Sequence, residues 1–336
     1  MMTNTRKLPK LDLNITNRCN FRCVHCAFDS GIEKMDELSL DELETILRET
    51  KELGGEKIDI TGGEPTVRKD LAEIIKLGKK YDFKIELVTN GSLITKNELL
   101  EYKNLGLDST AISLDGSNYK VYNKIRKVSE ESFNKTLQTI EDSVNIGLPT
   151  KINTVVFSSN LEDIPNITEL AIKKGAQEHG LYYFTPIGRG NSADELSVEP
   201  IKWLNFIREK LVKYNEQIKL LVEVPLIEKD FSKKKLGCIM DDDPYHLQIL
   251  PDGNVYPCAI MASYHKPIAN LHEKSVKEIW NDKSLWDNCF KEVSSDVFNE
   301  CSGYCTNFSS FNLKKYDTEK YKFVCPLRKF SVTEFK

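Results

Sequence analysis

The feature that most limits how this chain can fold is a repeated pair of segments, an apolar β-rich run followed by an amphipathic run with helical spacing. Six β-rich runs occur, at residues 11–16, 57–61, 84–89, 109–114, 151–156 and 180–186. One helical stripe comprises Phe133, Leu137, Ile140 and Val144. Ser39 followed by Glu42 is typical of a helix start, and glycines 54, 106, 147 and 175 stand where helices should end. This alternation predicts parallel strands joined by right-handed crossovers.

Unusual motifs follow four of the six β-rich runs. They are NRCNFRCVHC after the first, TGGEP after the second, TNG after the third and SLDG after the fourth. Six strand–helix units form either an open doubly wound sheet or an incomplete barrel, and in both the functional residues collect at the carboxyl ends of the strands. We therefore expect these four loops to face one cavity.

Composition narrows the class of protein. The 336 residues include 40% hydrophobic and 29% charged residues, as in an ordinary globular protein. No apolar run approaches the ~20 residues of a membrane span, and the first residues lack the apolar core of a secretory signal. We expect a cytoplasmic protein that does not bind membranes. The net charge of −4 argues against binding to nucleic acid.

Nine cysteines are an anomaly for such a chain, because disulfides are rare in a reducing compartment and metal or redox chemistry is the usual reason for cysteine clusters. Three of them form an N-terminal group, and the other six all follow residue 237: Cys19, Cys23 and Cys26, then Cys238, Cys258, Cys289, Cys301, Cys305 and Cys325. The gap between the two groups predicts two metal sites.

The N-terminal group has the spacing Cys19-x3-Cys23-x2-Cys26. Zinc sites usually have four ligands from paired Cys-x2-Cys turns, whereas three thiolates suit a four-iron cluster in which one iron has no protein ligand. A zinc site completed by His25 or by a distant residue is the alternative.

This spacing, followed by Gly62-Gly63-Glu64-Pro65, resembles the radical S-adenosylmethionine (radical SAM) superfamily over roughly residues 8–190. The resemblance implies a partial (β/α)6 TIM-type barrel and a 4Fe–4S cluster on Cys19, Cys23 and Cys26. In this family the open iron binds S-adenosylmethionine, and an electron from the reduced cluster cleaves the sulfonium bond. The 5′-deoxyadenosyl radical formed abstracts hydrogen from the substrate. The resemblance also implies a low-potential electron donor of the flavodoxin or ferredoxin type.

The resemblance further implies cofactor-binding roles in the first two loops. His25, just before the third cysteine, would lie against the cofactor. Gly62 and Gly63 would let the backbone approach the methionine moiety, and Glu64 would accept a hydrogen bond from its ammonium group.

Later loops supply the remaining candidates. Ser113 and Asp115 in SLDG match a polar pair near the ribose and sulfonium, and Arg126 in NKIRK matches an arginine that binds the methionine carboxylate. Asn153 is a further candidate, with an inward-facing structural asparagine as the alternative. The sequence Gly188-Arg189-Gly190 matches a segment of many relatives, although a simple turn also explains it.

The C-terminal cysteines resemble the SPASM and twitch domains, which hold auxiliary iron–sulfur clusters. Cys238 and Cys258 flank LQILPDGNVYPC, a predicted β-hairpin, and Cys301-x3-Cys305 and Cys325 continue the match. The full SPASM pattern expects two more cysteines, where this chain has Glu292 and Ser295. A zinc ribbon is disfavoured because no Cys-x2-Cys pair follows Cys26.

We therefore expect at least one auxiliary cluster, of the 4Fe–4S type, on Cys238, Cys258, Cys301 and Cys305. Cys289 and Cys325 remain as candidate hydrogen-atom donors to a substrate radical. The alternatives are buried structural thiols, or ligands of a second auxiliary cluster together with Cys301.

The expected parts are a radical SAM barrel at 8–195, a helical connection at 196–237 and an auxiliary-cluster domain at 238–336. The expected function is radical modification of a ribosomally synthesised peptide, by crosslinking, epimerisation or thioether formation. The alternatives are a small-molecule dehydrogenase or epimerase, a step in cofactor synthesis, and a non-catalytic iron or zinc sensor, which has no need of the GGEP and SLDG loops.

Two specialised subgroups of the superfamily are disfavoured, one by a single residue and one by the C-terminal sequence. Sulfatase-maturing relatives place an aspartate after the hairpin cysteine, where this chain has Ala259, and molybdenum-cofactor relatives end in Gly-Arg-Arg, whereas this chain ends in SVTEFK. Because about ten residues precede the first strand, no peptide-recognition domain is expected before the barrel.

Overall fold

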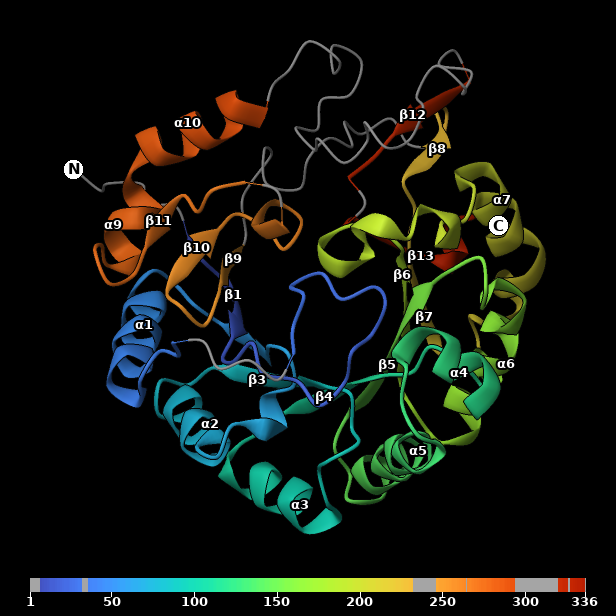
Figure 1. The fold of residues 1–336 in the computed structure, drawn as a ribbon, viewed down its shortest axis with the longest axis horizontal. Helices are drawn as coiled ribbons and strands as arrows, with labels where there is room; N and C mark the ends of the chain where they lie inside the picture. Colours follow the sequence, from blue (N-terminus) through green and yellow to red (C-terminus); the bar gives the residue numbers. More distant parts are fainter. Residues whose placement is uncertain are drawn as a thin grey trace.

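A computed structural model of the chain describes residues 7–31, 36–231, 246–263, 265–293, 320–325 and 327–335. Its main element is an 11-stranded sheet in the order β11-β10-β9-β1-β2-β3-β4-β5-β6-β7-β13. Figure 1 shows the sheet curving into a partial barrel with helices outside it. The six predicted strands are confirmed and pair in parallel: β1 (Lys10–Asn14), β2 (Lys57–Thr61), β3 (Lys84–Thr89), β4 (Ser109–Ser113), β5 (Thr150–Val156) and β6 (Glu178–Tyr183).

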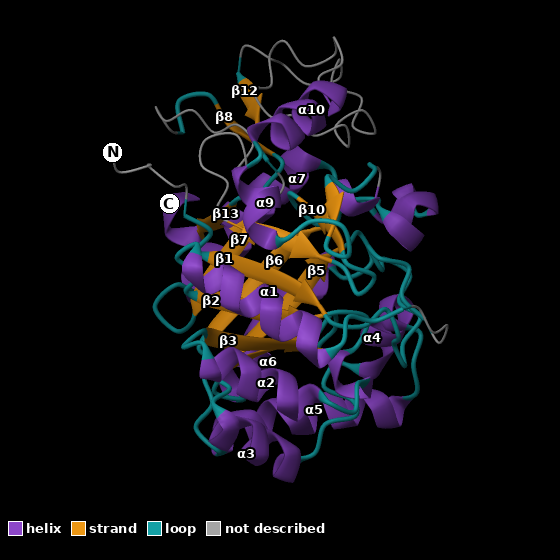
Figure 2. Ribbon diagram, turned by 90° about the vertical axis from the view of Figure 1, so that its left-hand side faces the viewer, coloured by secondary structure: helices purple, strands orange, loops and turns teal. Residues whose placement is uncertain are grey.

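Helices connect these strands and cover the outer face of the sheet, as α1 does in front of β1, β2 and β3 in Figure 2. The first helix begins at the predicted capping box of Ser39 and Glu42. Within the described residues, no helix has both the length and the apolar character that crossing a membrane requires. The helices of the barrel are α1 (Leu40–Glu52), α2 (Leu71–Lys80), α3 (Lys96–Leu105), α4 (Tyr119–Arg126), α5 (Glu130–Asn145) and α6 (Ile164–Lys173).

The connection expected to be helical over 196–237 is helical only in its first half. Helix α7 (Pro200–Phe206) continues as a π-helical turn over Ile207–Leu211, and the chain then forms β7 (Lys219–Glu223) and β8 (Leu226–Glu228). Strand β7 pairs in parallel with β6. The expectation was wrong here because the short apolar run KLLVE is a seventh parallel strand, whose side chains Leu220 and Val222 are buried.

The C-terminal segment adds strands to both edges of the barrel sheet. The predicted hairpin is confirmed as β9 (His246–Ile249) and β10 (Asn254–Tyr256), and β9 pairs in parallel with β1. At the other edge, a C-terminal strand pairs with β7. Both outer strands of the barrel sheet, β11 and β13, thus come from this segment. Its other elements are β11 (Ala269–Asn270), α9 (Val276–Asn281), α10 (Lys283–Val293), β12 (Tyr321–Phe323), which pairs with β8, and β13 (Lys329–Ser331).

Two apolar clusters form the core, and the C-terminal segment contributes to both. One surrounds β1, β2 and β3 and includes Trp280 of α9; the other surrounds β4, β5, β6 and β7 and includes Phe330 of β13. Both side chains are at most 5% exposed. Because burying a large apolar side chain contributes about 1.5–3 kcal/mol, the C-terminal segment is part of the same folding unit as the barrel.

Inside the barrel, charged side chains alternate in sign at the amino-terminal half of the strands. Lys10 lies 2.7 Å from Asp12 and 2.8 Å from Asp59, and Lys57 lies 2.8 Å from Asp59. Glu86 of β3 continues this row, with Lys57 at 3.3 Å and Lys151 of β5 at 2.5 Å. Burial alone would raise the pKa of Asp59, but the two lysines hold that pKa below its ordinary value. Paired charges therefore fill the closed end of the barrel.

Candidate active site

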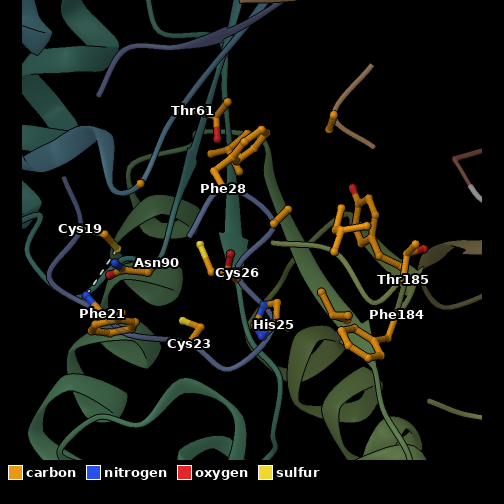
Figure 3. Close-up of a pocket in the computed structure, with 18 of the residues that line it drawn as sticks. Cys19, Phe21, Cys23, His25, Cys26, Phe28, Thr61, Asn90, Phe184 and Thr185 are labelled. Atoms are coloured by element: carbon orange, nitrogen blue, oxygen red, sulfur yellow. Dashed lines mark hydrogen bonds between the residues drawn. The ribbon is translucent and has the colours of Figure 1, made fainter. Parts of the chain in front are cut away.

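A cavity of about 320 Å³ opens at the carboxyl ends of the strands. All four motif loops contribute to its wall, with the cysteines after β1, Gly62 and Gly63 after β2, Asn90 after β3 and Ser113 at the end of β4. Figure 3 shows Cys19, Cys23, Cys26 and His25 around this space, facing Phe184 and Thr185 from the loop that follows β6. The expected convergence of the loops is confirmed.

The cysteine loop presents three sulfur atoms to this cavity. The backbone amide of Phe21 donates to Cys19 Sγ at 3.4 Å, and that of Ser30 donates to Cys26 Sγ at 3.3 Å. Burial raises the pKa of the Cys19 thiol to about 12 and also raises the pKa of Cys23. Three sulfurs on one cavity wall, two of them with amide donors, fit an iron–sulfur cluster, and binding the cluster would displace the thiol protons.

A loop after β6 holds the cysteine loop in place. The backbone amide of Arg189 donates to Cys26 O at 2.9 Å, and its guanidinium donates to Cys23 O at 2.7 Å and to Ser30 O at 2.5 Å. Gly188 has φ +54°, and a Cβ there would lie 2.2 Å from Ala27 O. The Gly188-Arg189-Gly190 sequence is therefore a brace for the cysteine loop, a role that sequence reasoning missed.

Arg189→Ala is expected to weaken retention of the N-terminal cluster by about 10–100-fold, the usual effect of losing groups that support metal ligands. The measurement is the rate at which a chelator removes the EPR signal that responds to S-adenosylmethionine. Arg48→Ala is the matched control, because Arg48 is a half-exposed arginine paired with Glu52 on the outer helix α1. Equal chelator resistance in the wild type and Arg189→Ala would show that the brace does not support the cluster.

The two glycines of the GGEP loop allow close contact with the segment that leads into the cysteine loop. Gly63 N donates to Thr16 O at 2.7 Å, and Glu64 N donates to Arg18 O at 2.9 Å. A Cβ on Gly62 would lie 2.5 Å from Thr16 O, and one on Gly63 would lie 2.4 Å from Arg18 O. Any larger residue would push these two loops apart.

Glu64 is buried and its carboxylate joins the ends of two strands. It accepts hydrogen bonds from Thr89 Oγ1 at 2.6 Å and from the Asn90 backbone at 2.7 Å, and from both the hydroxyl and the amide of Thr66. Burial raises the pKa of Glu64, whereas these hydrogen bonds act to lower it. Glu64 is not among the residues that line the cavity. Its expected contact with the cofactor ammonium stays a prediction.

Asp115 and Arg126 form a buried pair beside the cysteine loop. Arg126 Nε donates to Asp115 Oδ2 at 2.5 Å, while the Val155 amide donates to Asp115 Oδ1 at 2.8 Å. Arg126 Nη1 lies 3.7 Å from Cys23 Sγ and Arg126 lines the cavity. Asp115 thus orients an arginine that faces the expected cofactor position.

His25 lies at the same wall, with Nε2 3.9 Å from Asp115 Oδ2. Burial lowers its pKa to about 4, so the imidazole is neutral near pH 7. Its Nδ1 atom is buried without a hydrogen-bond partner among the described residues. A buried polar atom of this kind fits a bound group beside the cysteine loop.

The remaining predicted residue, Asn153, lies on β5 below the cavity wall. It is not a lining residue, and its Oδ1 accepts a hydrogen bond from Tyr182 OH at 3.2 Å. The opposite wall comes from residues that sequence reasoning did not single out, Tyr182 of β6 and Glu223 of β7. Ala259, at the position where sulfatase-maturing relatives carry an aspartate, also lines the cavity.

Two of the C-terminal cysteines lie near this cavity. Cys258 is buried after β10 in an apolar cluster with Ile187 and Ile260, and nearby Ser263 Oγ donates to Ala27 O of the cysteine loop at 3.0 Å. Cys325 is buried after β12. Helix α10 carries Cys289, whose side chain is outside the described part, as are Cys238, Cys301 and Cys305 entirely. The auxiliary ligand set and both hydrogen-donor candidates stay predictions.

Comparison with known proteins agrees with this geometry. Residues 13–171 match the model of the radical SAM superfamily, and residues 238–306 match that of an iron–sulfur cluster-binding domain, SPASM. The AdoMet-dependent heme synthase of Methanosarcina barkeri is 27% identical over 307 residues, covering 85% of each chain. The Fe-coproporphyrin III synthase of the same organism is 27% identical over 312 residues, covering 83% of this chain and 75% of its own.

The fold is also shared with a solved structure. Streptococcus suis SuiB bound to S-adenosylmethionine superposes with a TM-score of 0.71 at 19% sequence identity, over 84% of this chain and 68% of SuiB.

Proposed function

We propose that this chain, which belongs to the SPASM subgroup of the radical SAM superfamily, modifies an iron-containing tetrapyrrole that bears carboxylate side chains. The chain is a radical SAM enzyme, with S-adenosylmethionine, a 4Fe–4S cluster and an auxiliary iron–sulfur cluster as cofactors. When bound, the first two supply the radical that removes a hydrogen atom from substrate. Cys19, Cys23 and Cys26 would hold the cluster.

The observation that supports this substrate class is the extent of two sequence matches. The heme synthase and the Fe-coproporphyrin III synthase match 85% and 83% of this chain, so both alignments extend beyond the barrel. The C-terminal segment forms part of the cavity wall through Ala259, Ile260 and Leu327. These side chains, with Phe184 and Ile187, give an apolar wall that suits a flat, largely apolar ring.

The other cavity residues would position the cofactor. Arg126, held by Asp115, would bind the methionine carboxylate, and Ser113, which lines the cavity, would contact the ribose. Neutral His25 would pack against the cofactor and donate or accept through its unpartnered Nδ1. The apolar wall would exclude water from the reacting centre.

The test is anaerobic turnover with Fe-coproporphyrin III as probe. Reconstituted enzyme, dithionite and S-adenosylmethionine are incubated with and without the porphyrin. We expect the porphyrin to raise 5′-deoxyadenosine formation by at least about tenfold, a barrier change of ~1.4 kcal/mol. Mass spectrometry should show a porphyrin of altered mass. No stimulation and an unchanged porphyrin would contradict the tetrapyrrole proposal.

A peptide is the second candidate, and it stays the prediction made from the sequence. SuiB, whose fold this chain shares, has been solved with its precursor peptide SuiA, at 18% identity to this chain. The two candidates separate in one experiment, in which short peptides encoded beside the gene replace the porphyrin. A peptide of altered mass, with an unchanged porphyrin, would favour the second candidate.

A further inference from the structure

Glu223 stands on the wall of the cavity opposite the cysteine loop. It is the last residue of β7, is 4% exposed, and is the only carboxylate among the described lining residues. In the sheet order β7 is six strands from β1, the strand that leads into the cysteine loop. No part of the cofactor site described above uses this carboxyl group, so its place in the cavity needs another explanation.

The strands next to β7 place a tyrosine and a lysine beside Glu223. Lys329 of β13 is the register partner of Glu223, and the pairing of Leu181 with Val222 puts Tyr182 beside it on β6. Residues opposite each other on neighbouring strands lie within contact distance on the same face. Glu223, Tyr182 and Lys329 therefore form one polar group on the inner face of the barrel.

Hydrogen bonds fix this group. Lys329 Nζ donates to Tyr182 OH at 2.8 Å and lies 4.4 Å from the centre of its ring, and Tyr182 OH donates to Asn153 Oδ1 at 3.2 Å. Tyr182 thus uses its proton on Asn153, so it offers none to a ligand. Glu223 supplies the carboxyl group that this wall presents to the cavity.

The surroundings of Glu223 favour its protonated form. Burial raises its pKa to about 8, while Lys329 and a hydrogen bond from the Tyr183 backbone act in the opposite direction and Cys325 adds to the rise. A protonated carboxyl group is a hydrogen-bond donor, and Lys329, its register partner on β13, places a positive charge on the same wall. A donor next to a positive charge suits an anionic ligand group.

We propose that Glu223, backed by Lys329 and Tyr182, is the substrate-binding anchor of the cavity and donates a hydrogen bond to a carboxylate of the substrate. The inference rests on the proposed function, since it gives one carboxylate side chain of the tetrapyrrole a defined contact. Held there, the substrate would present a neighbouring carbon toward the cysteine loop across the cavity.

The experiment compares the dissociation constants of Fe-coproporphyrin III and its methyl ester, measured by the change in porphyrin absorbance on binding to the cluster-loaded enzyme. The wild type is expected to bind the acid about tenfold more tightly than the ester, the size of one hydrogen bond to a charged group. Glu223→Ala should lose this preference. Glu223→Gln should keep most of it, because its amide still donates.

The matched control is Glu178→Gln, which alters a carboxylate of β6 that pairs with Lys219 and does not line the cavity. The Glu178→Gln variant should keep the full preference for the acid over the methyl ester. If Glu223→Ala does not fold, Lys329→Met tests the same group and should reduce the preference by removing the charge.

The outcomes separate the two proposals. Porphyrin turnover by the wild type together with an unchanged acid-over-ester preference in Glu223→Ala would overturn the anchor and leave the proposed function standing. A wild type that binds neither porphyrin would overturn the tetrapyrrole proposal and the anchor with it.

Discussion

Replacing Cys19, Cys23 and Cys26 together with alanine is expected to abolish 5′-deoxyadenosine formation. The three sulfurs line one cavity, and each thiolate is a ligand that the cluster cannot replace from elsewhere in the loop. Loss of the cluster removes both the electron source and the binding site of S-adenosylmethionine. The measurement is chromatography of the reaction products after reduction with dithionite.

The iron content of the same variant provides the control. Iron bound by the C-terminal cysteines should remain, so the iron content should fall by about four atoms per chain, the content of one four-iron cluster. Normal cleavage of S-adenosylmethionine by the triple variant would show that the cysteine loop has another role, such as the zinc site considered as the alternative.

Arg126→Met is expected to have the second large effect, on stability as well as on cofactor binding. Asp115 is fully buried, and its closest cation is Arg126 at 2.5 Å. Removing one partner of a buried ion pair leaves an uncompensated charge, which typically costs about 3–5 kcal/mol. We expect a lower midpoint of thermal unfolding and a dissociation constant for S-adenosylmethionine raised by about tenfold or more.

A double variant separates these two effects. Arg126→Met with Asp115→Asn removes both charges, so most of the lost stability should return, while the weak cofactor binding should persist. If the cofactor affinity returns together with the stability, Arg126 serves only to compensate Asp115, and the role transferred from the family is assigned to the wrong residue.

Local features of the fold were predictable because they depend on neighbouring residues. The six barrel strands, the capping box at Ser39 and the hairpin around Gly253 all follow from short patterns. The buried face of α5 was predicted less well. Phe133 and Ile140 are buried, but Leu137 and Val144 are only half-buried, and three hydroxyl residues of this helix are buried instead.

Those hydroxyl groups explain the difference. Thr136 Oγ1 donates to Asn90 O at 2.8 Å, Thr139 Oγ1 donates to Gly91 O at 2.6 Å, and Ser143 shares a hydrogen bond with Thr150. The two threonines tie α5 to the TNG loop at the cavity, and Ser143 ties it to the start of β5. A polar residue with a partner distant in the chain cannot be recognised from an apolar stripe.

The site was predictable where motifs are local and unpredictable where contacts cross the barrel. The three cysteines and the two glycines were expected at the cavity and line it. Asp115 and Arg126 were each singled out from the sequence, but the ion pair between them was not. The brace from Arg189 spans 166 residues to Cys23, and the group around Glu223 depends on the pairing of β7 with β13. Such pairings are set by which strand occupies each edge of the sheet, which single-sequence patterns do not encode.

The pairing of β1 with β9 also means that one edge of β1 stays unpaired during much of synthesis. Strand β1 acquires its second neighbour only when His246–Ile249 has been made, roughly 10–50 s later at about 5–20 residues per second. Until then its edge is open to any other strand. Lys10 and Asp12 put two charges on that edge, a feature that disfavours pairing between chains. Lys10 and Asp12 would therefore lower the tendency of the nascent chain to aggregate before β9 is made.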